Sequence, residues 1–212
     1  MKYNLQFDEE HHIYTVDGVE VPSVTEIVQF LSVGTAAAAS PWQRNMAAAL
    51  GTRVHQATVL YDYIGLDLDM YDYDVFPYIR GYSDFVRDYR INGYILTEQR
   101  ITNGDYAGTL DRLGMIDGKL TVIDFKTGTT IDPRKEAAQL YGYAKILADN
   151  GFLGKDFFYD FRGMIVRLSK DGKYKAVERN VYCGKLFFEK CRDLDSLIKE
   201  DKKHGRTGIV NS

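Results

Sequence analysis

Two aspartates and a lysine lie in one stretch, residues 105–143, whose sequence predicts how they are placed. Asp111 lies within YAGTLDRLGMI, while Asp124 and Lys126 lie within KLTVIDFK. Both segments are rich in β-branched and apolar residues, which is typical of strands. The Asp117-Gly118 pair between them is a strong signal for a two-residue hairpin turn. These side chains could therefore meet across a β-hairpin.

The turn sets the register of the hairpin. If Asp117-Gly118 forms the turn, counting back along both strands places Asp111 directly across from Asp124. Such partners have Cβ atoms about 4.5 to 5.5 Å apart, and the two-residue period of a strand puts Lys126 on the same face. Two opposed carboxylates destabilise a sheet unless one is protonated or a cation lies between them. The preferred interpretation is a divalent metal ion.

A simpler interpretation remains open. Asp111 could lie at a strand end in water, and Asp124 could pair only with Lys126 or Arg112. Exposed acids are common, so this would be the default for an aspartate chosen at random. Both acids lie in otherwise apolar strands, however, where an unpaired charge is costly. This cost favours a functional site.

A third acid comes from the preceding segment, YILTEQRITNGDY. A two-residue turn at Asn103-Gly104 would place Glu98 opposite Thr109, on the face that carries Asp111. A bulge would turn Glu98 to the other face. A solvent-facing glutamate paired with a nearby arginine is an equally good interpretation.

Two expected helices flank the hairpin. A long helix over residues 41–63, with a possible break or kink at Gly51, carries His55. A lone histidine is more often a core or surface residue, although imidazole is the commonest nitrogen ligand of metals. A second helix, from Asp132-Pro133 to Asn150-Gly151, carries Gln139 and Tyr143 on one face. Both could project toward the site, or Tyr143 could pack among neighbouring leucines.

The remaining elements indicate a mixed α/β (α+β) fold in one domain over residues 1–212. Strands are expected at 3–8 and within 11–22, with a turn at Asp17-Gly18, and a Ser23 capping box opens a short helix. Further elements follow in order: a helix near 75–91, a hairpin of 161–169 with 173–179, a helix within 183–203 and a tail over 204–212.

Composition limits the class of protein. With 212 residues, 45% of them hydrophobic and 27% charged, the chain has enough material for one globular core. No apolar stretch approaches the roughly 18 residues that span a bilayer, and the N-terminus is too polar for a signal peptide. We expect a cytoplasmic protein. Its two cysteines, Cys183 and Cys191, form no zinc or iron–sulfur motif.

The net charge of −3 argues against indiscriminate coating of nucleic acid, although a local basic channel remains possible. Residues 54–79 contain five aspartates and neither lysine nor arginine. We expect this flank to repel phosphate.

The motifs GTLD, VIDFKTG and QLYGY, with GTRVH upstream, resemble the RecB-type branch of the PD-(D/E)XK nuclease superfamily. They follow the family order over residues 51–147, and DGVEVPSVTEI is similar to openings of phage and mitochondrial-type members. The resemblance implies a restriction-endonuclease-like core over about 41–182, with a mixed central sheet flanked by helices and an extra N-terminal β-hairpin.

The resemblance also implies roles for individual residues. Lys126 would be the catalytic lysine, and Gln139 and Tyr143 would organise the site or touch DNA. The implied metal ligands are His55, Asp111, Asp124, the backbone carbonyl of Phe125 and, where some members carry another acid, Glu98. The residues expected to contact nucleic acid are Arg53, Arg112, Thr127 and Tyr143.

The implied activity is that of a Mg²⁺- or Mn²⁺-dependent deoxyribonuclease with one or two ions and no iron–sulfur cluster. The resemblance favours an exonuclease acting on single-stranded DNA or free ends, in phage or bacterial recombination, repair or processing. Without a phosphate-binding helicase motif, a helicase or recombination protein would be a separate partner. The alternatives are an inactive nuclease-fold binding module and a hydrolase of small phosphoesters.

Overall fold

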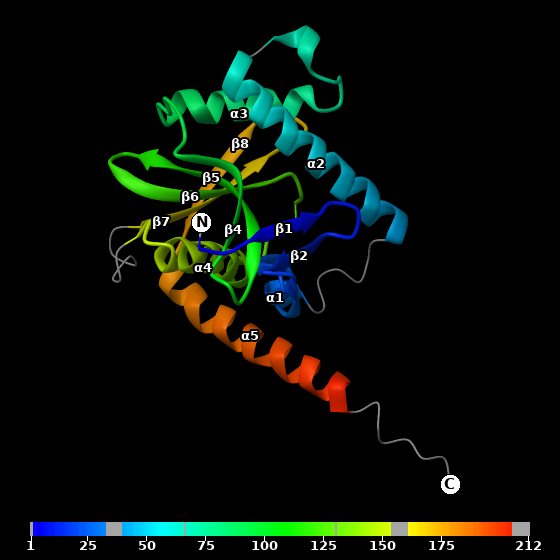
Figure 1. Cartoon of the computed structure of the whole chain (residues 1–212). Helices are drawn as coiled ribbons and strands as arrows, with labels where there is room; N and C mark the ends of the chain where they lie inside the picture. Colours follow the sequence, from blue (N-terminus) through cyan, green and yellow to red (C-terminus); the bar gives the residue numbers. More distant parts are fainter. Residues whose placement is uncertain (1, 33–39, 66, 130, 154–160, 205–212) are drawn as a thin grey trace.

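The computed structural model describes residues 2–32, 40–65, 67–129, 131–153 and 161–204, which form two β-sheets and their covering helices (Figure 1). The first sheet is antiparallel and has the strand order β1-β2-β3. The second has five strands in the order β4-β5-β6-β7-β8, with β6 and β7 parallel. The expected α/β class is confirmed. The strands are β1 (Leu5–Asp8), β2 (Ile13–Val16), β3 (Val19–Val21), β4 (Leu96–Thr102), β5 (Ala107–Ile116), β6 (Lys119–Lys126), β7 (Phe161–Leu168) and β8 (Tyr174–Arg179).

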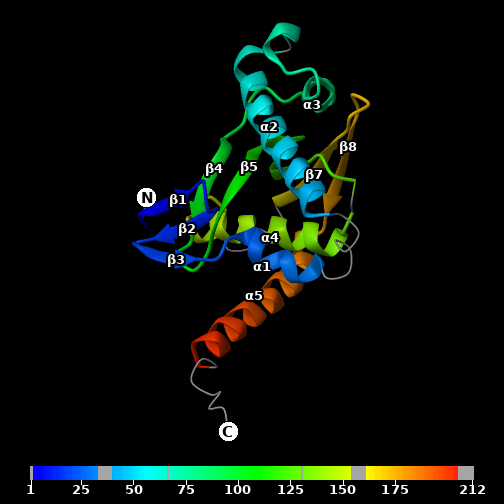
Figure 2. The same cartoon turned by 90° about the vertical axis from the view of Figure 1, so that its right-hand side faces the viewer.

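Helices cover both faces of the five-stranded sheet (Figure 2). On one face, Val122 and Ile165 pack in a core with α1, α4 and α5. On the other, Ile123 and Phe125 pack in a core with α2 and α3. None of the helices in the described part of the chain is long and apolar enough to cross a membrane. The helices are α1 (Val24–Ile27), η1 (Val28–Ser32), α2 (Pro41–Ile64), η2 (Leu68–Met70), α3 (Phe76–Asp88), α4 (Pro133–Asp149) and α5 (Val181–His204).

The central hairpin has the predicted turn. Asp117 and Gly118 have φ of 49° and 75°, and two successive residues in this left-handed region are typical of the primed turns that match strand twist. Ile116 pairs with Lys119, and the register continues to Arg112 opposite Ile123. The residues next in this register are Asp111 and Asp124, as predicted.

The register between β4 and β5 differs from the prediction. Thr102 pairs with Ala107, so the connection is a four-residue loop instead of a two-residue turn at Asn103-Gly104. Arg100, and not Glu98, therefore faces Thr109. Because the shift is two residues, it keeps every side chain on its predicted face. The printed pairing passes over Glu98, which has a left-handed φ of 44°, but Thr97 and Gln99 on either side pair with Arg112 and Leu110, so Glu98 lies beside Asp111.

The N-terminal strands form a three-stranded sheet that contains the expected hairpin. The Asp17-Gly18 turn joins β2 to β3, as predicted, and β1 pairs with β2 as an additional strand. Both halves of the capping box at Ser23 are present. A bridge from Ser23 to Ala107 ties this sheet to the start of β5.

The helices that flank the hairpin follow local signals closely. Asp132 caps α4 by accepting hydrogen bonds from the backbone of Arg134 and Lys135. The helix ends at Asp149, as predicted. Helix α2 runs through Gly51 as one helix of 24 residues, so the break considered there does not occur. At the end of the described chain, α5 begins at Val181, two residues before the expected start at 183.

Candidate metal-binding and active site

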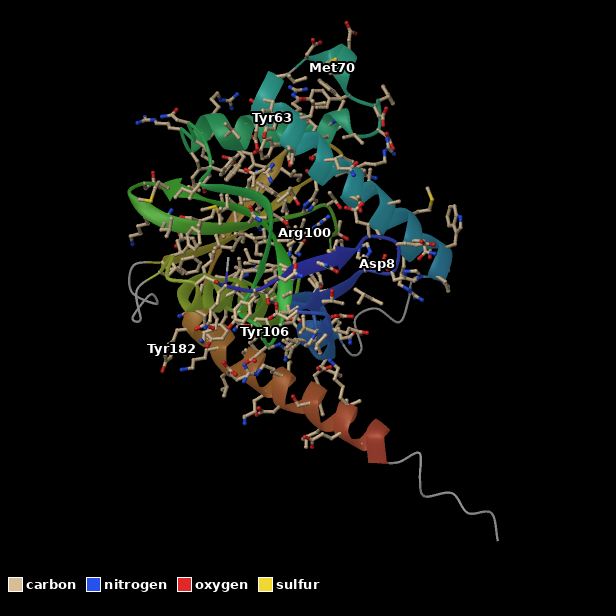
Figure 3. The ribbon with its side chains drawn as sticks, viewed as in Figure 1. Asp8, Tyr63, Met70, Arg100, Tyr106 and Tyr182 are labelled. Carbon is tan, nitrogen blue, oxygen red and sulfur yellow. The ribbon has the colours of Figure 1, made fainter. Side chains whose placement is uncertain are left out.

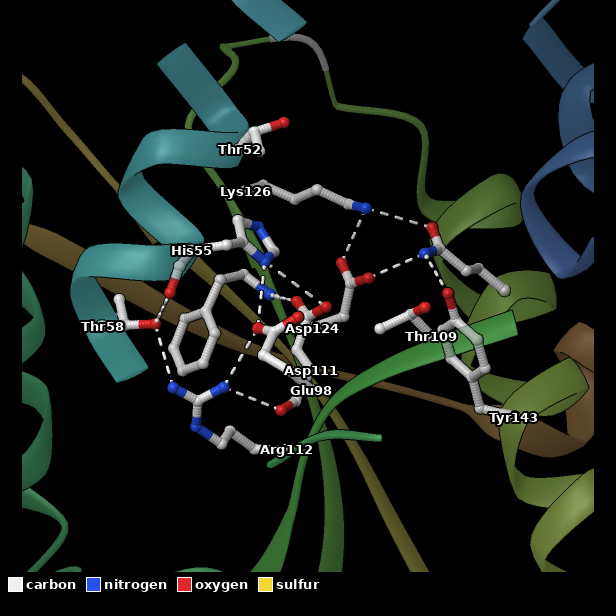
Figure 4. A network of polar contacts seen from close by, with 12 residues as sticks. Thr52, His55, Thr58, Glu98, Thr109, Asp111, Arg112, Asp124, Lys126 and Tyr143 are labelled. Atoms are coloured by element: carbon white, nitrogen blue, oxygen red, sulfur yellow. Dashed lines mark hydrogen bonds and ion pairs between the residues drawn. The ribbon is translucent and has the colours of Figure 1, made fainter. Parts of the chain in front are cut away.

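The site lies at the carboxyl end of β6, where Asp124 and Lys126 share one face of the strand (Figure 4). The Nζ of Lys126 lies 2.8 Å from Oδ2 of Asp124, so the two side chains form an ion pair. Asp124 is 3% exposed. The predicted convergence of the two residues is confirmed, and it creates a shielded charge pair at the end of a strand.

Asp111 bridges the two strands of the hairpin. Its Oδ2 accepts a hydrogen bond of 2.7 Å from the backbone N–H of Phe125. This contact continues the link between β5 and β6 beyond the last paired residues. Its other oxygen, Oδ1, lies 3.5 Å from Nδ1 of His55. Asp111 is therefore held in place by one oxygen and presents the other to the site.

His55, Glu98 and Asp111 form a group that could hold a metal ion. One ligand atom of each lies within 4.8 Å of the others, and Nδ1 of His55 is 3.4 Å from Oε1 of Glu98. Three separate elements supply them, namely α2, β4 and β5. The carboxylate of Asp124 is instead engaged by Lys126 and Gln139.

The charges of this group depend on one another. Burial raises the pKa of Asp111 to about 7, against the opposing influence of His55. Burial alone would lower the pKa of His55, but the carboxylates of Asp111 and Glu98 outweigh it and raise that pKa to about 9. In the metal-free protein, an imidazolium therefore serves as the counter-ion of the acids. A metal ion would replace that proton.

Gln139 and Tyr143 organise the other side of the site from α4. Gln139 donates to Oδ1 of Asp124 at 2.7 Å and accepts from Nζ of Lys126 at 3.1 Å. The Tyr143 hydroxyl lies 3.4 Å from Nε2 of Gln139. The tyrosine is 4% exposed, and it packs so closely on Gly108 that a Cβ there would lie 2.8 Å from its ring. Tyr143 thus supports Gln139, and because it also lines the cleft its expected contact with DNA stays a prediction.

Arg112 does not contact nucleic acid, contrary to expectation, because its side chain is fully buried (0% exposed). Its guanidinium donates to Oε1 of Glu98 at 3.1 Å and to Oγ1 of Thr58 at 3.0 Å. It also forms an ion pair of 3.0 Å with Asp62. The buried guanidinium of Arg112 therefore holds the carboxylate of Glu98 in position from the protein interior.

Thr58 and Asp62 were missed by the sequence reasoning. Thr58 links Arg112 to the backbone carbonyl of His55, to which its hydroxyl donates at 2.7 Å. Residues 55, 58 and 62 recur at helical spacing, so they lie on one face of α2. Once His55 was a candidate ligand, this spacing could have identified Thr58 and Asp62.

The other two residues expected at a nucleic-acid surface differ in their surroundings. The guanidinium of Arg53 binds both Asp72 and Asp74 at 2.6 Å, so the acidic segment already occupies it. Thr127 lines the cleft and lies close to α2 at Gly51, where an added Cβ would be 3.6 Å from its hydroxyl. Only Thr127 has the expected position beside the site.

The site opens into a cleft of about 980 Å³. One wall is formed by α2, through Ala47, Ala48 and Gly51, and the opposite wall includes Phe7 and Tyr14 of the N-terminal sheet. The cleft is also lined by the charged residues of the site, His55, Glu98, Asp111, Asp124 and Lys126. A molecule larger than a single nucleotide could therefore reach them.

Comparisons with protein-family models and with curated proteins find no match for the chain.

Proposed function

We propose that this chain is a metal-dependent deoxyribonuclease of the RecB-type branch of the PD-(D/E)XK superfamily. The observation that carries the proposal is the meeting of Asp111, Asp124 and Lys126 at one end of the β5–β6 hairpin, beside His55 and Glu98. In this proposal the five-stranded mixed sheet is the restriction-endonuclease-like core. The three-stranded N-terminal sheet is an addition to it.

The donor set suits a divalent metal ion. Carboxylate oxygens with one imidazole nitrogen are ligands that Mn²⁺ accepts, and hard oxygen ligands suit Mg²⁺. The buried carboxylate of Asp111 needs a cation beside it, which the imidazolium of His55 supplies and a metal ion could supply in its place. His55, Glu98 and Asp111 would hold one ion, and Asp124 and the carbonyl of Phe125 would join if Asp124 exchanged its present partners. A bound ion would supply an acidified water and stabilise negative charge on a phosphate.

Lys126 acts in this proposal as a fixed positive charge. Burial by itself would lower its pKa, but Asp124 and Asp111 outweigh that effect and raise it. The ammonium thus stays protonated and is oriented by Asp124 and Gln139. It can donate to the attacking water or to a phosphate oxygen and so stabilise the charge that develops during hydrolysis.

A cleavage assay tests the proposal. End-labelled linear and circular DNA, single- and double-stranded, would be incubated with Mg²⁺, Mn²⁺ or EDTA. We expect metal-dependent loss of linear DNA only, which indicates the exonuclease that the family resemblance favours. Cleavage of circles would instead indicate an endonuclease. No cleavage under any condition would refute the nuclease and leave the binding module.

The wider setting belongs to the same proposal. We place the protein in the cytoplasm of a bacterium or phage-infected cell, in DNA recombination, repair or processing, with a helicase or recombination protein as a possible separate partner. The intact Asp, Asp and Lys set argues against an inactive binding module. The open cleft favours a polymer over a small phosphoester.

A further inference from the structure

The wall of the cleft opposite α2 carries a cluster of flat side chains that the proposed reaction does not use. We call Phe7, His12, Tyr14 and Arg100 the N-terminal platform. They come from β1, from the residue before β2, from β2 and from β4, and all four line the same cleft as Asp111 and Lys126. Figure 3 labels Arg100, on β4, and Asp8, at the end of β1.

The platform is packed around the ring of Phe7. The centroid of the Tyr14 ring lies 4.4 Å from that of Phe7, and the His12 ring approaches it edge-on at 5.5 Å. The guanidinium carbon of Arg100 lies over the Phe7 ring at 4.8 Å from its centroid. Phe7 therefore supports the other three groups.

A hydrogen bond fixes the platform relative to the carboxylates. The hydroxyl of Tyr14 lies 2.8 Å from Oγ1 of Thr109, and Thr109 is two residues from Asp111 on the same face of β5. Tyr14 itself is buried, whereas His12 is exposed and the side chain of Arg100 is 45% exposed. The surfaces that remain open to a ligand are thus an imidazole and a guanidinium, both planar.

The charge of the cleft does not favour binding through phosphates alone. Among the described residues that line it, the carboxylates are Glu9, Glu98, Asp111 and Asp124, and the permanent cations are Arg100 and Lys126. Both cations are already paired, Arg100 with Glu9 at 2.6 Å and Lys126 with Asp124 at 2.8 Å. Affinity for a nucleic acid must therefore draw on other contacts.

Base stacking is the contact that this wall offers. Aromatic rings and arginine planes stack on bases of any sequence, provided the bases are unpaired. A duplex keeps the faces of its bases inside its own stack. The part of α2 that lines the cleft includes small residues at Ala47, Ala48 and Gly51.

Building on the proposed function, we propose that the N-terminal platform stacks an unpaired base beside the reaction centre and so makes the site selective for single-stranded DNA. His12 and Arg100 supply the stacking surfaces. Phe7 and Tyr14 are positioning residues that hold them relative to Asp111.

Binding measurements with two conservative variants test this inference. His12 has a left-handed φ of 56°, which asparagine tolerates, so His12→Asn removes the ring with little backbone strain. Arg100→Lys keeps the charge and removes the plane. His11→Asn is the matched control, because His11 is exposed, pairs with Asp8 and is not among the described residues that line the cleft.

Each variant would be made in a Lys126→Ala background to prevent cleavage. Binding of a labelled single-stranded oligonucleotide and of its blunt duplex would be measured by fluorescence anisotropy with Mn²⁺. We expect His12→Asn and Arg100→Lys each to raise the single-strand Kd by about tenfold, the lower part of the range for losing one stacked base. Duplex binding and the His11→Asn control should be unchanged.

Two other results are distinguishable. If both platform variants bind single-stranded DNA as tightly as their parent, or lose single-strand and duplex binding equally, the inference is overturned while cleavage by the wild type still supports the nuclease. If the wild type neither cleaves nor binds DNA, the proposed function fails and the inference fails with it.

Discussion

At the scale of single residues, Lys126 is held by a carboxylate and an amide. It is held between Asp124 and Gln139, at 2.8 Å and 3.1 Å, and it keeps its charge although its side chain is only 34% exposed. A fixed positive charge of this kind stabilises a transition state without reorganising during the reaction. The exposed Lys119, at the other end of β6, has no such surroundings and provides a natural comparison.

We predict that Lys126→Ala lowers the DNA cleavage rate by at least about a hundredfold, because it removes a preorganised donor to the developing charge. DNA binding should persist, which filter binding or anisotropy would show. Lys119→Ala should cleave at the wild-type rate. Retained cleavage in the Lys126 variant, with normal folding by circular dichroism, would remove this lysine from the mechanism.

Asp111 has two separable tasks. One oxygen holds the Phe125 N–H and the other faces His55. Asparagine can still accept the bond from Phe125, so Asp111→Asn should weaken Mn²⁺ binding by about tenfold or more while preserving the hairpin. Calorimetric titration with Mn²⁺ measures this, with the exposed Asp105→Asn as control. An unchanged isotherm would show that Asp111 is no ligand.

The pKa values of the site predict how metal affinity changes with pH. In the folded metal-free protein, the pKa of Asp111 is raised to about 7 and that of His55 to about 9. Both groups therefore bind protons more tightly in the folded chain than in the unfolded chain. Their contribution to the free energy of unfolding is lost as the pH rises, between about pH 4 and 7 for Asp111 and between about pH 6.5 and 9 for His55.

A metal ion must displace these protons, so its affinity should rise with pH. We predict an increase in Mn²⁺ affinity of up to roughly tenfold per pH unit for each proton displaced, between about pH 6 and about pH 8. Titrations in buffers with different ionisation enthalpies would count the protons released. An affinity independent of pH would contradict this assignment of the ligands.

At the scale of elements, the close crossing of α4 and α5 depends on a glycine. A Cβ built at Gly184 would lie 2.1 Å from the backbone carbonyl oxygen of Ala137. Because this neighbour is backbone, it cannot rotate away, and the two helices would have to separate. Since α4 carries Gln139 and Tyr143, the packing of α5 supports the site indirectly.

We predict that Gly184→Ala lowers the free energy of unfolding by about 1 to 3 kcal/mol through overpacking. Urea denaturation followed by circular dichroism would measure the change. Cys183→Ala, at the neighbouring exposed position of the same helix, should change stability by less than about 0.5 kcal/mol. Equal stability of the two variants would mean that the helices do not approach this closely.

At the scale of the whole molecule, the site joins parts that lie in different layers. His55 comes from α2 on one face of the five-stranded sheet, whereas Gln139 comes from α4 on the other. An ion bound by His55, Glu98 and Asp111 would connect α2, β4 and β5. Such an ion binds the folded chain in preference to the unfolded one and so must stabilise the whole domain.

We predict that Mn²⁺ at about a hundred times its Kd stabilises the fold by about 2.7 kcal/mol. For a domain of this size, that corresponds to a rise of roughly 5 to 10 °C in Tm. Differential scanning calorimetry would measure it, with Asp111→Asn expected to show a much smaller rise. An equal rise in both proteins would indicate binding elsewhere.

Much of the fold and part of the site could be predicted from the sequence. A few adjacent residues determine the Asp117-Gly118 turn, the Asp132 cap and the end of α4 just before Asn150, because backbone conformation there depends on local side chains. The Asp117-Gly118 turn set the register that brings Asp111 toward Asp124 and Lys126. The position of His55 beside them was supplied by family resemblance.

The tertiary structure decided everything that depends on distant segments. Arg112 is buried because α2 supplies Thr58 and Asp62 as its partners, and Arg53 is occupied because residues 72 and 74 fold back onto α2. Glu98 meets Asp111 because the loop before β5 is longer than its turn residues suggested. Such outcomes depend on packing between segments tens of residues apart. By itself, the sequence determined which side chains the hairpin presents, whereas the packing of α2, α4 and the N-terminal sheet around it decided which of them line the cleft.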